Sequence, residues 1–344
     1  MNSPVRKTVF VVALLLSVLW TSTSMAELKI ERVKYGGWPN CVRMSNGTIE
    51  LIATTDVGPR IIHFGFIGKD NEFFEDPKQL GKTNAEKWLA FGGHRLWLAP
   101  EAKPRSYHPD SKPVKAYQKD QSVQLIQPIE TDNGIQKEML ITMAPSGSKV
   151  TVDHKLTNRN LWAVEVAPWA LTVLAPGGRA IFPQESYSPH PDIPDFPDQK
   201  IDKKFYLPVR VMTLWSYTNL ADPRWVFTRK YIVLKQDPKA TNPQKLGLSN
   251  RQNWGAYLRN NHLFVKINPY QDGAIYPDHG CTFETFTNAD MLELEGLGPL
   301  VKLAPNGGTT TYSEDWHLFD NVKADNTDKS LDASVLPKVK SILK

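Results

Sequence analysis

Side chains able to do acid–base or ligand-binding chemistry are concentrated between Phe91 and Glu101, where the sequence reads FGGHRLWLAPE. If a strand covers this segment, alternation places His94 on one face and Arg95 with Trp97 on the other. An indole can stack on the C–H face of a sugar while a guanidinium donates to its hydroxyls. The pattern favours a carbohydrate-binding surface that includes Glu101; a buried strand end with an ion-paired arginine is the alternative.

A carboxyl group occupies the middle of another expected strand, in the segment YPDHGCTFETF that begins at Tyr276. A strand from 281 would place Glu284 on one face with a threonine and a phenylalanine. Such a carboxylate is costly to bury without a partner, so its pKa should rise toward the range of a general base. Asp278 and His279 precede it and are candidate ligand contacts.

Two further glutamates, Glu293 and Glu295, are spaced to share one face of a strand. Their mutual repulsion disfavours ionisation of both, which suits a reactive site, although a solvated strand face gives the same pattern. Trp169 lies in another polar–aromatic segment and could either contact a ligand or belong to the core.

The fold class follows from many short strand patterns separated by Gly, Pro, Asn and Asp. Residues 123–127 and 135–142 form an expected hairpin, and residues 150–157 alternate apolar and polar side chains. Residues 84–89 form a short candidate helix, and the Pro-rich stretch 187–208 predicts a long loop. The chain contains 26 prolines, which disfavour long helices. We therefore predict an all-β sandwich or barrel.

The N-terminus has the pattern of an export signal. Arg6 and Lys7 precede an apolar run at 9–20, and Ser24-Met-Ala26 resembles a peptidase site. We expect cleavage after residue 26 and a periplasmic or secreted protein; an uncleaved anchor is the alternative. No later segment is apolar for long enough to insert stably in a membrane. Removal of the two cations lowers the formal charge from +5 to +3, which does not predict a nucleic-acid partner.

The two cysteines, Cys41 and Cys281, could form a disulfide in an oxidising compartment or remain separate buried thiols. No Cys-x-x-Cys motif is present, and the eight histidines are scattered. Nucleotide-binding and hydrolase motifs are also missing from the sequence. We therefore predict neither a metal nor a cofactor.

Three blocks together resemble the galactose mutarotase-like β-supersandwich superfamily, in an uncharacterised bacterial branch of it. They are DVGPRIIHFGF from Asp56, GGHRLW from Gly92, and a C-terminal block from Cys281 to Phe319 that includes FETF. The resemblance covers residues from about Val33 to Phe319. It implies a large antiparallel β-sandwich with few short helices, as a single domain at 27–320, followed by a peripheral tail at 321–344.

The resemblance also implies a sugar-processing enzyme of aldose 1-epimerase type, which needs no cofactor. Glu284 would be the base and His94 the acid at the anomeric centre. Further residues would bind the carbohydrate: Arg95, Trp97, Trp169, Glu101, Glu293, Asp278, His279 and Arg60. A non-catalytic glycan-binding module, or a polysaccharide lyase or glycosidase on the same scaffold, are the alternatives, because one fold supports several functions.

Overall fold

The computed structural model describes residues 28–186 and 208–343. The expected export signal at 1–26 and nearly all of the expected Pro-rich loop at 187–208 lie outside these residues. In the part that is described, no helix has the length and apolar character required to cross a bilayer.

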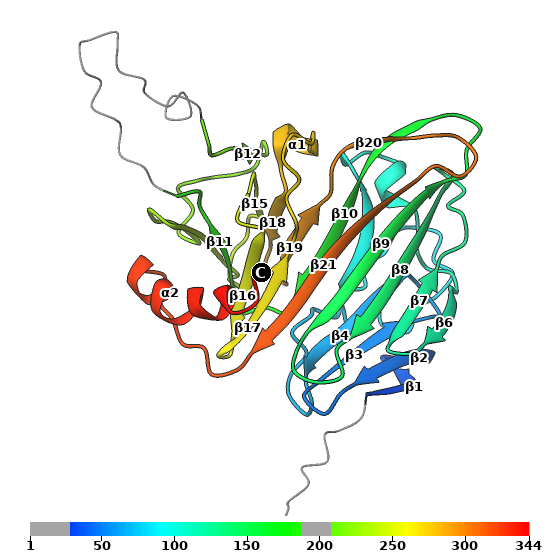
Figure 1. Ribbon diagram of the computed structural model, residues 1–344, viewed down its shortest axis with the longest axis horizontal. Coiled ribbons are helices and arrows are strands. Elements are labelled where there is room, and N and C mark those ends of the chain that lie inside the picture. The colour runs from blue at the N-terminus through cyan, green and yellow to red at the C-terminus, as the bar shows by residue number, and fades with distance from the viewer. Residues whose placement is uncertain (1–27, 187–207, 344) are drawn as a thin grey trace, which may run out of the picture.

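Two large antiparallel sheets face each other (Figure 1). The described residues of the first sheet form eleven strands in the order β1-β2-β3-β4-β5-β10-β19-β18-β15-β12, with β20 paired to β10. These strands are β1 (Lys29–Tyr35), β2 (Trp38–Ser45), β3 (Ile49–Thr54), β4 (Arg60–Phe66), β5 (Gly93–Ala99), β10 (Val164–Leu174), β12 (Met212–Leu214), β15 (Gln244–Leu248), β18 (Phe283–Thr287), β19 (Leu292–Leu297) and β20 (Val301–Leu303).

The described part of the second sheet has ten strands in the order β13-β14-β11-β16-β17-β21-β9-β8-β7-β6. These strands are β6 (Lys115–Lys119), β7 (Ser122–Ile126), β8 (Ile135–Met143), β9 (Val150–Asn158), β11 (Arg179–Pro183), β13 (Trp225–Phe227), β14 (Tyr231–Lys235), β16 (Trp254–Arg259), β17 (His262–Ile267) and β21 (Thr309–Phe319). The hairpin of β7 and β8 confirms the one expected from the sequence.

The main core lies between the two sheets, and strand alternation decides which residues enter it. Along β9, Val150, Val152, His154 and Leu156 point inward and are fully buried, while the alternate residues at 151, 153 and 155 are partly exposed. Phe64 from the first sheet meets Phe264 and Trp316 from the second, with ring centroids 5.8 Å apart in both cases. The prediction of an all-β sandwich is confirmed.

Helices are short, but one expected helix is not formed. Residues 84–89 form a loop, in which Asn84 has a φ of 52°, outside the right-handed helical region. The helical elements are η1 (Arg105–Tyr107), α1 (Pro277–Gly280), α2 (Asp328–Ser334) and α3 (Leu336–Lys340).

The C-terminal segment, expected as a peripheral tail at 321–344, carries α2 and α3, whose apolar side chains pack against the second sheet. Leu331, Val335 and Val339 are fully buried and pack with Trp254 and Val265, which lie on the outer face of the second sheet. Figure 1 shows the two red C-terminal helices, of which α2 is the outer, beside the end of the sheet that contains β16 and β17. Apolar spacing of four residues along this segment explains why it docks as an amphipathic pair of helices.

Cys41 and Cys281 are both free and buried, so the suggested disulfide is not present. Cys41 packs with Trp38 and Phe91, whereas Cys281 belongs to a separate apolar cluster with Trp97 and Trp169. The open choice between a bridge and two thiols is resolved in favour of the thiols.

Candidate active site

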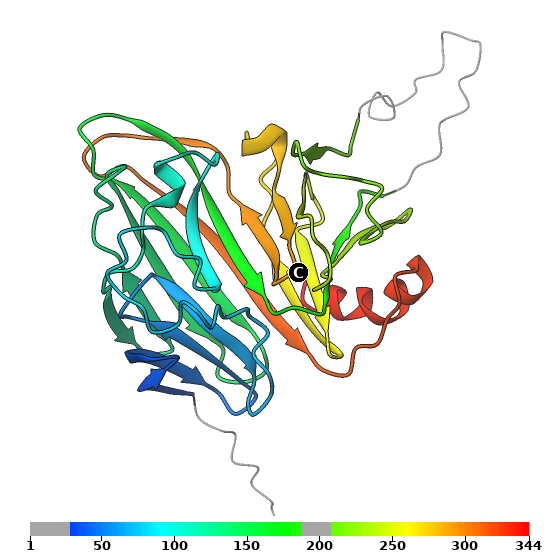
Figure 2. The ribbon, with the colours of Figure 1, turned by 180° about the vertical axis from the view of Figure 1, so that it is seen from behind.

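The candidate site lies on the outer face of the first sheet, where five neighbouring strands align their side chains. The strands β5, β10, β19, β18 and β15 are consecutive in the sheet (Figure 2). Their register places Arg95 beside Leu171, Leu171 beside Glu295, Glu295 beside Glu284, and Glu284 beside Gly247. This row therefore brings together charged groups that are up to about 200 residues apart in the sequence, because cross-strand neighbours lie only about 5 Å apart.

The outer face forms a cavity of about 260 Å³ above this row. Strands supply its floor, and the loops that flank β5 and follow β12 supply its aromatic walls. The lining residues are Trp88, Arg95, Trp97, Glu101, Tyr107, Trp169, Leu171, Tyr217, Lys245, Phe286, Met291 and Glu293. Aromatic walls with a few converging polar groups are typical of a small-molecule site.

Lys245 connects the two glutamates at the centre of the floor. Its ammonium lies 2.9 Å from Glu284 and 3.5 Å from Glu295. The Trp169 indole donates a hydrogen bond to Glu295 at 2.9 Å. Lys245 also lies against the rings of Trp169 and Trp215, at 4.8 and 4.6 Å from their centroids. The cation is held by charge and by two aromatic faces, so its position is well defined.

Gly247 explains how Glu284 fits beside this cation. A Cβ at position 247 would lie 2.4 Å from the Cys281 sulfur, 3.3 Å from Trp215 and 3.4 Å from the Glu284 side chain. Only a residue without a side chain leaves this space free.

Arg95 forms the other charged wall of the cavity. Its side chain lies between Trp97 and Trp88, with the guanidinium carbon 4.7 and 5.4 Å from the two ring centroids. One amino nitrogen approaches Glu293 at 3.4 Å, while Nε and the other amino nitrogen have no hydrogen-bond partner among the described residues. A guanidinium that is 2% exposed and only partly paired is available for a ligand oxygen.

Burial changes the protonation of the site's carboxyl groups. It raises the pKa of Glu284 well above its usual value, against the opposing effect of Lys245. Burial, followed by the Glu295 charge, raises the pKa of Glu293 to about 7, although Arg95 and Lys245 oppose the shift. Burial lowers the pKa of Lys245, but Glu295 and Glu284 outweigh that effect and raise it, so this residue stays cationic. One carboxyl group can thus be protonated beside an ion pair near neutral pH.

His94 is not part of the cavity, which corrects its assignment as the acid. It alternates with Arg95 along β5 and therefore points into the space between the sheets. There it is fully buried, bonds Thr172 at 2.8 Å and His154 at 3.1 Å, and lies edge-on to Trp316. Burial lowers its pKa well below the usual range, so the imidazole is neutral.

The imidazoles of His94 and His154 and the carboxylate of Glu314 form a compact buried group, with ligand atoms within 4.8 Å of one another. The types of ligand would suit a transition metal. However, the Lys266 ammonium lies 3.0 Å from Glu314 and also donates to the Ala170 and Leu294 carbonyls. The carboxylate already has a cationic partner, so we interpret this group as a polar network that joins the sheets.

We expect the change His94→Leu to affect stability and not the chemistry of the cavity. It would leave Thr172 and His154 without their partner, which costs about 1–3 kcal/mol for buried polar groups. Urea unfolding should detect this loss, while sugar binding by the folded variant should match that of the wild type. Normal stability combined with lost binding would show that His94 belongs to the site.

Other expected contacts divide between the cavity and the rest of the fold. The structure brings together Arg95, Trp97, Trp169, Glu101 and Glu293, while Asp278 and Glu284 line an adjoining cavity. His279 is exposed and lines neither cavity.

Arg60 is not a ligand contact either. It is fully buried, pairs with Asp110 at 2.8 Å and donates to the Ala90 carbonyl at 3.0 Å. Its role is therefore to brace the loop that carries Trp88.

Sequence reasoning missed several residues that line these cavities, among them Trp88, Tyr107, Trp215, Tyr217 and Lys245. Four of these lie outside the strands, where alternation gives no orientation. Lys245 did carry a signal, because a single cation within the apolar strand QKLGL must find a countercharge if it is buried.

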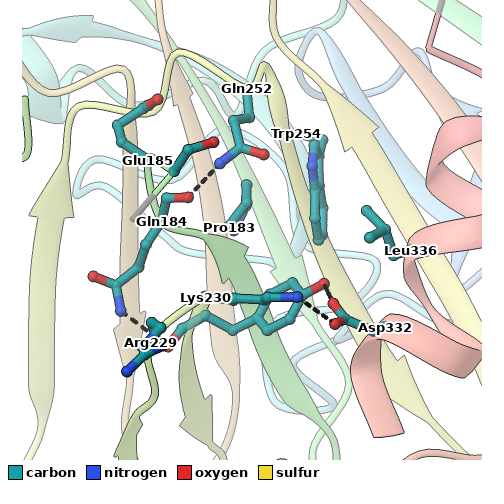
Figure 3. A pocket seen from close by; sticks show the side chains of 11 residues that line it. Pro183, Gln184, Glu185, Arg229, Lys230, Gln252, Trp254, Asp332 and Leu336 are labelled. Atoms are coloured by element: carbon teal, nitrogen blue, oxygen red, sulfur yellow. Dashed lines mark hydrogen bonds and ion pairs between the residues drawn. The ribbon is translucent and has the colours of Figure 1, made fainter. Parts of the chain in front are cut away.

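A separate pocket of about 380 Å³ lies between β11, β14 and the C-terminal helices (Figure 3). Asp332 on α2 accepts hydrogen bonds from Lys230 at 2.5 Å and from the Tyr231 hydroxyl at 2.8 Å, and Gln252 donates to the Gln184 carbonyl. These polar groups bind one another and attach the helices to the sheet, so the pocket does not resemble the site of converging charges described above.

Comparison with known proteins agrees with the architecture. No family model and no curated protein matches the sequence, whereas solved structures match the fold. A candidate aldose 1-epimerase from Klebsiella pneumoniae has a TM-score of 0.56 at 11% identity, covering 91% of this chain and 87% of its own. A galactose mutarotase related enzyme from Lactobacillus acidophilus has a TM-score of 0.51 at 6% identity, covering 82% and 98%.

The Slr1438 protein from Synechocystis sp. PCC 6803 also matches, with a TM-score of 0.51 at 8% identity, covering 85% of this chain and 99% of its own. The chain therefore has the galactose mutarotase-like β-supersandwich fold. At 6–11% identity these structures show the fold alone, so the chemistry of the present chain has to be argued from its own site.

Proposed function

We propose that this protein is a sugar isomerase of aldose 1-epimerase type, with Glu284 as the base and Glu293 as the acid. The observation that carries the proposal is that both glutamates are buried at the floor of aromatic-walled cavities on one sheet face, beside Arg95 and Lys245. The N-terminal pattern at 1–26 supports a site of action outside the cytoplasm.

Glu284 suits the role of base because Lys245 is the only charged group in the described part of the chain that pairs with its carboxylate, which leaves carboxylate oxygen available to accept a proton. Its contact with Lys245 is 2.9 Å, and neither carboxylate oxygen has another partner among the described residues. Burial strengthens it as a base by raising its pKa, while the charge of Lys245 opposes that rise and favours the ionised form.

Glu293 suits the role of acid because it can carry a proton at neutral pH. The β18–β19 register makes it a diagonal neighbour of Glu284, a separation of about 7–8 Å between backbone positions. A pyranose lying between the two carboxyl groups could present its anomeric hydroxyl to one and its ring oxygen to the other.

The proposed reaction then balances without a cofactor. Glu284 removes the proton of the anomeric hydroxyl, and the freed electron pair forms the carbonyl at C1. The C1–O5 bond breaks, and O5 takes both bonding electrons and the proton of Glu293. Rotation about the C1–C2 bond and the reverse steps give the other anomer and restore both glutamates.

Anomer exchange tests the proposal directly. Crystalline α-D-glucose and α-D-galactose would be dissolved with the protein, and the approach to equilibrium followed by polarimetry and proton NMR. We expect the rate for an accepted sugar to rise in proportion to protein concentration. A rate equal to that of buffer for every aldose tested would contradict the proposal.

The ionisation of Glu293, the proposed acid, should also appear in the pH dependence of kcat/KM. Glu293 donates only when protonated, so kcat/KM should fall as pH rises through about 7. Glu293→Gln cannot donate a proton, so its rate should be at least about 100-fold lower and should lack this alkaline limb. An unchanged limb in the variant would assign it to a different group.

A non-catalytic glycan-binding module is the second candidate. The ion pair of Glu284 with Lys245 favours it, because a well-paired carboxylate is a weaker base. This candidate requires saccharide binding by calorimetry together with no acceleration of anomer exchange, so the same preparation distinguishes the two.

A further inference from the structure

A second cavity, of about 330 Å³, adjoins the first on the same face of the sheet. The two have Glu101, Tyr107 and Trp169 in common, so they are neighbouring parts of one cleft. We name the first the inner cavity and the second the outer cavity. The outer cavity is lined by Glu101, Ala102, Lys103, Tyr107, Trp169, Trp215, Asp278 and Glu284.

The two proposed catalytic glutamates lie on either side of the boundary between the cavities. Glu293 lines the inner cavity and Glu284 the outer one, while Lys245 bridges them by reaching Glu284 from the inner side. A sugar that reacts between the two glutamates would therefore leave part of the outer cavity unfilled.

Each cavity has its own aromatic platform and its own polar groups. Trp88 and Trp97 line the inner cavity, and the Trp88 indole nitrogen is buried without a hydrogen-bond partner among the described residues. Trp215, Lys103 and Asp278 serve the outer cavity, and Trp215 is only partly buried. An aromatic ring with nearby hydrogen-bonding groups is what a pyranose requires, because its C–H face stacks while its hydroxyls bond.

The outer cavity is also held in a specific conformation. Asp278 and His279 have φ angles of 50° and 65°, in a left-handed region that few residues adopt. The Asp278 carbonyl accepts a hydrogen bond from Thr213 at 2.8 Å, which joins this turn to β12, just before Trp215. Strained backbone of this kind persists where surrounding structure fixes it.

We infer that the cleft takes a saccharide of at least two sugar units, with the reacting unit between the glutamates and the next unit in the outer cavity on Trp215. This inference rests on the proposed function and specifies its substrate class as reducing oligosaccharides in preference to free hexoses.

Isothermal titration calorimetry with matched sugars tests it: glucose against maltose, cellobiose and lactose, each of which carries glucose at its reducing end. We expect one disaccharide to bind at least about tenfold more tightly than the free hexose, corresponding to one additional stacked ring. Trp215→Ala should reduce this preference to about one. Trp88→Ala should weaken the hexose and the disaccharide alike.

Trp162→Ala is the matched control, because Trp162 is 64% exposed and lines neither cavity. It should leave all affinities unchanged, and near-ultraviolet circular dichroism should show that each variant is folded. The inference is overturned if no disaccharide in the set binds more tightly than its hexose, or if the preference persists in Trp215→Ala.

The two proposals fail separately. Accelerated anomer exchange of free hexoses with no preference for disaccharides would refute the outer subsite and leave the isomerase intact. Preferential disaccharide binding without accelerated exchange at any reducing end would refute the isomerase and retain the subsite.

Discussion

Replacing Glu284 with glutamine should reduce catalysed anomer exchange by about 100- to 10,000-fold, the range expected when a general base is removed. The amide has nearly the same shape, so the cavity should keep its form, but it cannot accept the proton of the anomeric hydroxyl. Polarimetry with an accepted sugar would measure the loss, and calorimetry would show whether sugar still binds.

Glu165→Gln provides the control, because Glu165 is an exposed carboxylate on β10, a strand that also forms the floor of the site. Its exchange rate should equal that of the wild type. If Glu284→Gln also retained the wild-type rate, a different residue would have to be the base.

Lys245→Met should have the largest effect on stability. The change keeps a long apolar side chain against Trp169 and Trp215 but removes the cation between Glu284 and Glu295. A buried carboxylate without its partner costs about 3–5 kcal/mol. Urea unfolding should show this loss near neutral pH.

The loss should depend on pH in a defined direction. Without the cation, burial keeps the pKa of Glu284 higher in the folded state than in the unfolded state, so the folded variant binds more protons. Its stability relative to the wild type is then greatest below about pH 4.5 and decreases as pH rises toward 8. Unfolding at pH 5 and pH 8 would detect the trend, and an equal deficit at both values would contradict it.

The double variant Lys245→Met/Glu284→Gln provides a further check. Removing one of the two unpaired charges should restore part of the lost stability, and a double-mutant cycle would give the coupling energy. Fully additive losses would mean that the 2.9 Å ion pair contributes little to stability.

The sequence predicted the fold class and the faces of several strands because alternation is a local property. It placed Arg95 with Trp97, and Glu293 with Glu295, on common faces, and the structure agrees. Alternation also places His94 and Arg95 on opposite faces of the strand. Because Arg95 lines the cleft, this alternation alone predicts that His94 points away from it.

What the sequence could not supply was the pairing of distant strands and the course of the loops. The neighbours of Glu284 are Lys245 and Glu295, and the first comes from another part of the chain, which local patterns do not encode. The pattern at 84–89 predicts a helix that would carry Trp88, and no pattern predicts a direction for Trp215. Both residues lie in irregular loops, which have no period from which side-chain directions can be inferred.

In the cleft, strands carry the ionisable groups of the floor and loops carry most of the aromatic walls, and these two parts should differ in how readily their sequences can change. The ionisable groups of the floor alternate with core residues along the same strands, as Glu284 does between Phe283 and Thr285. A one-residue shift of such a strand would exchange the two sets, so this layer tolerates little alteration. The walls come from loops that can lengthen or be replaced independently, so divergence in the accepted sugar should occur there while the floor stays constant.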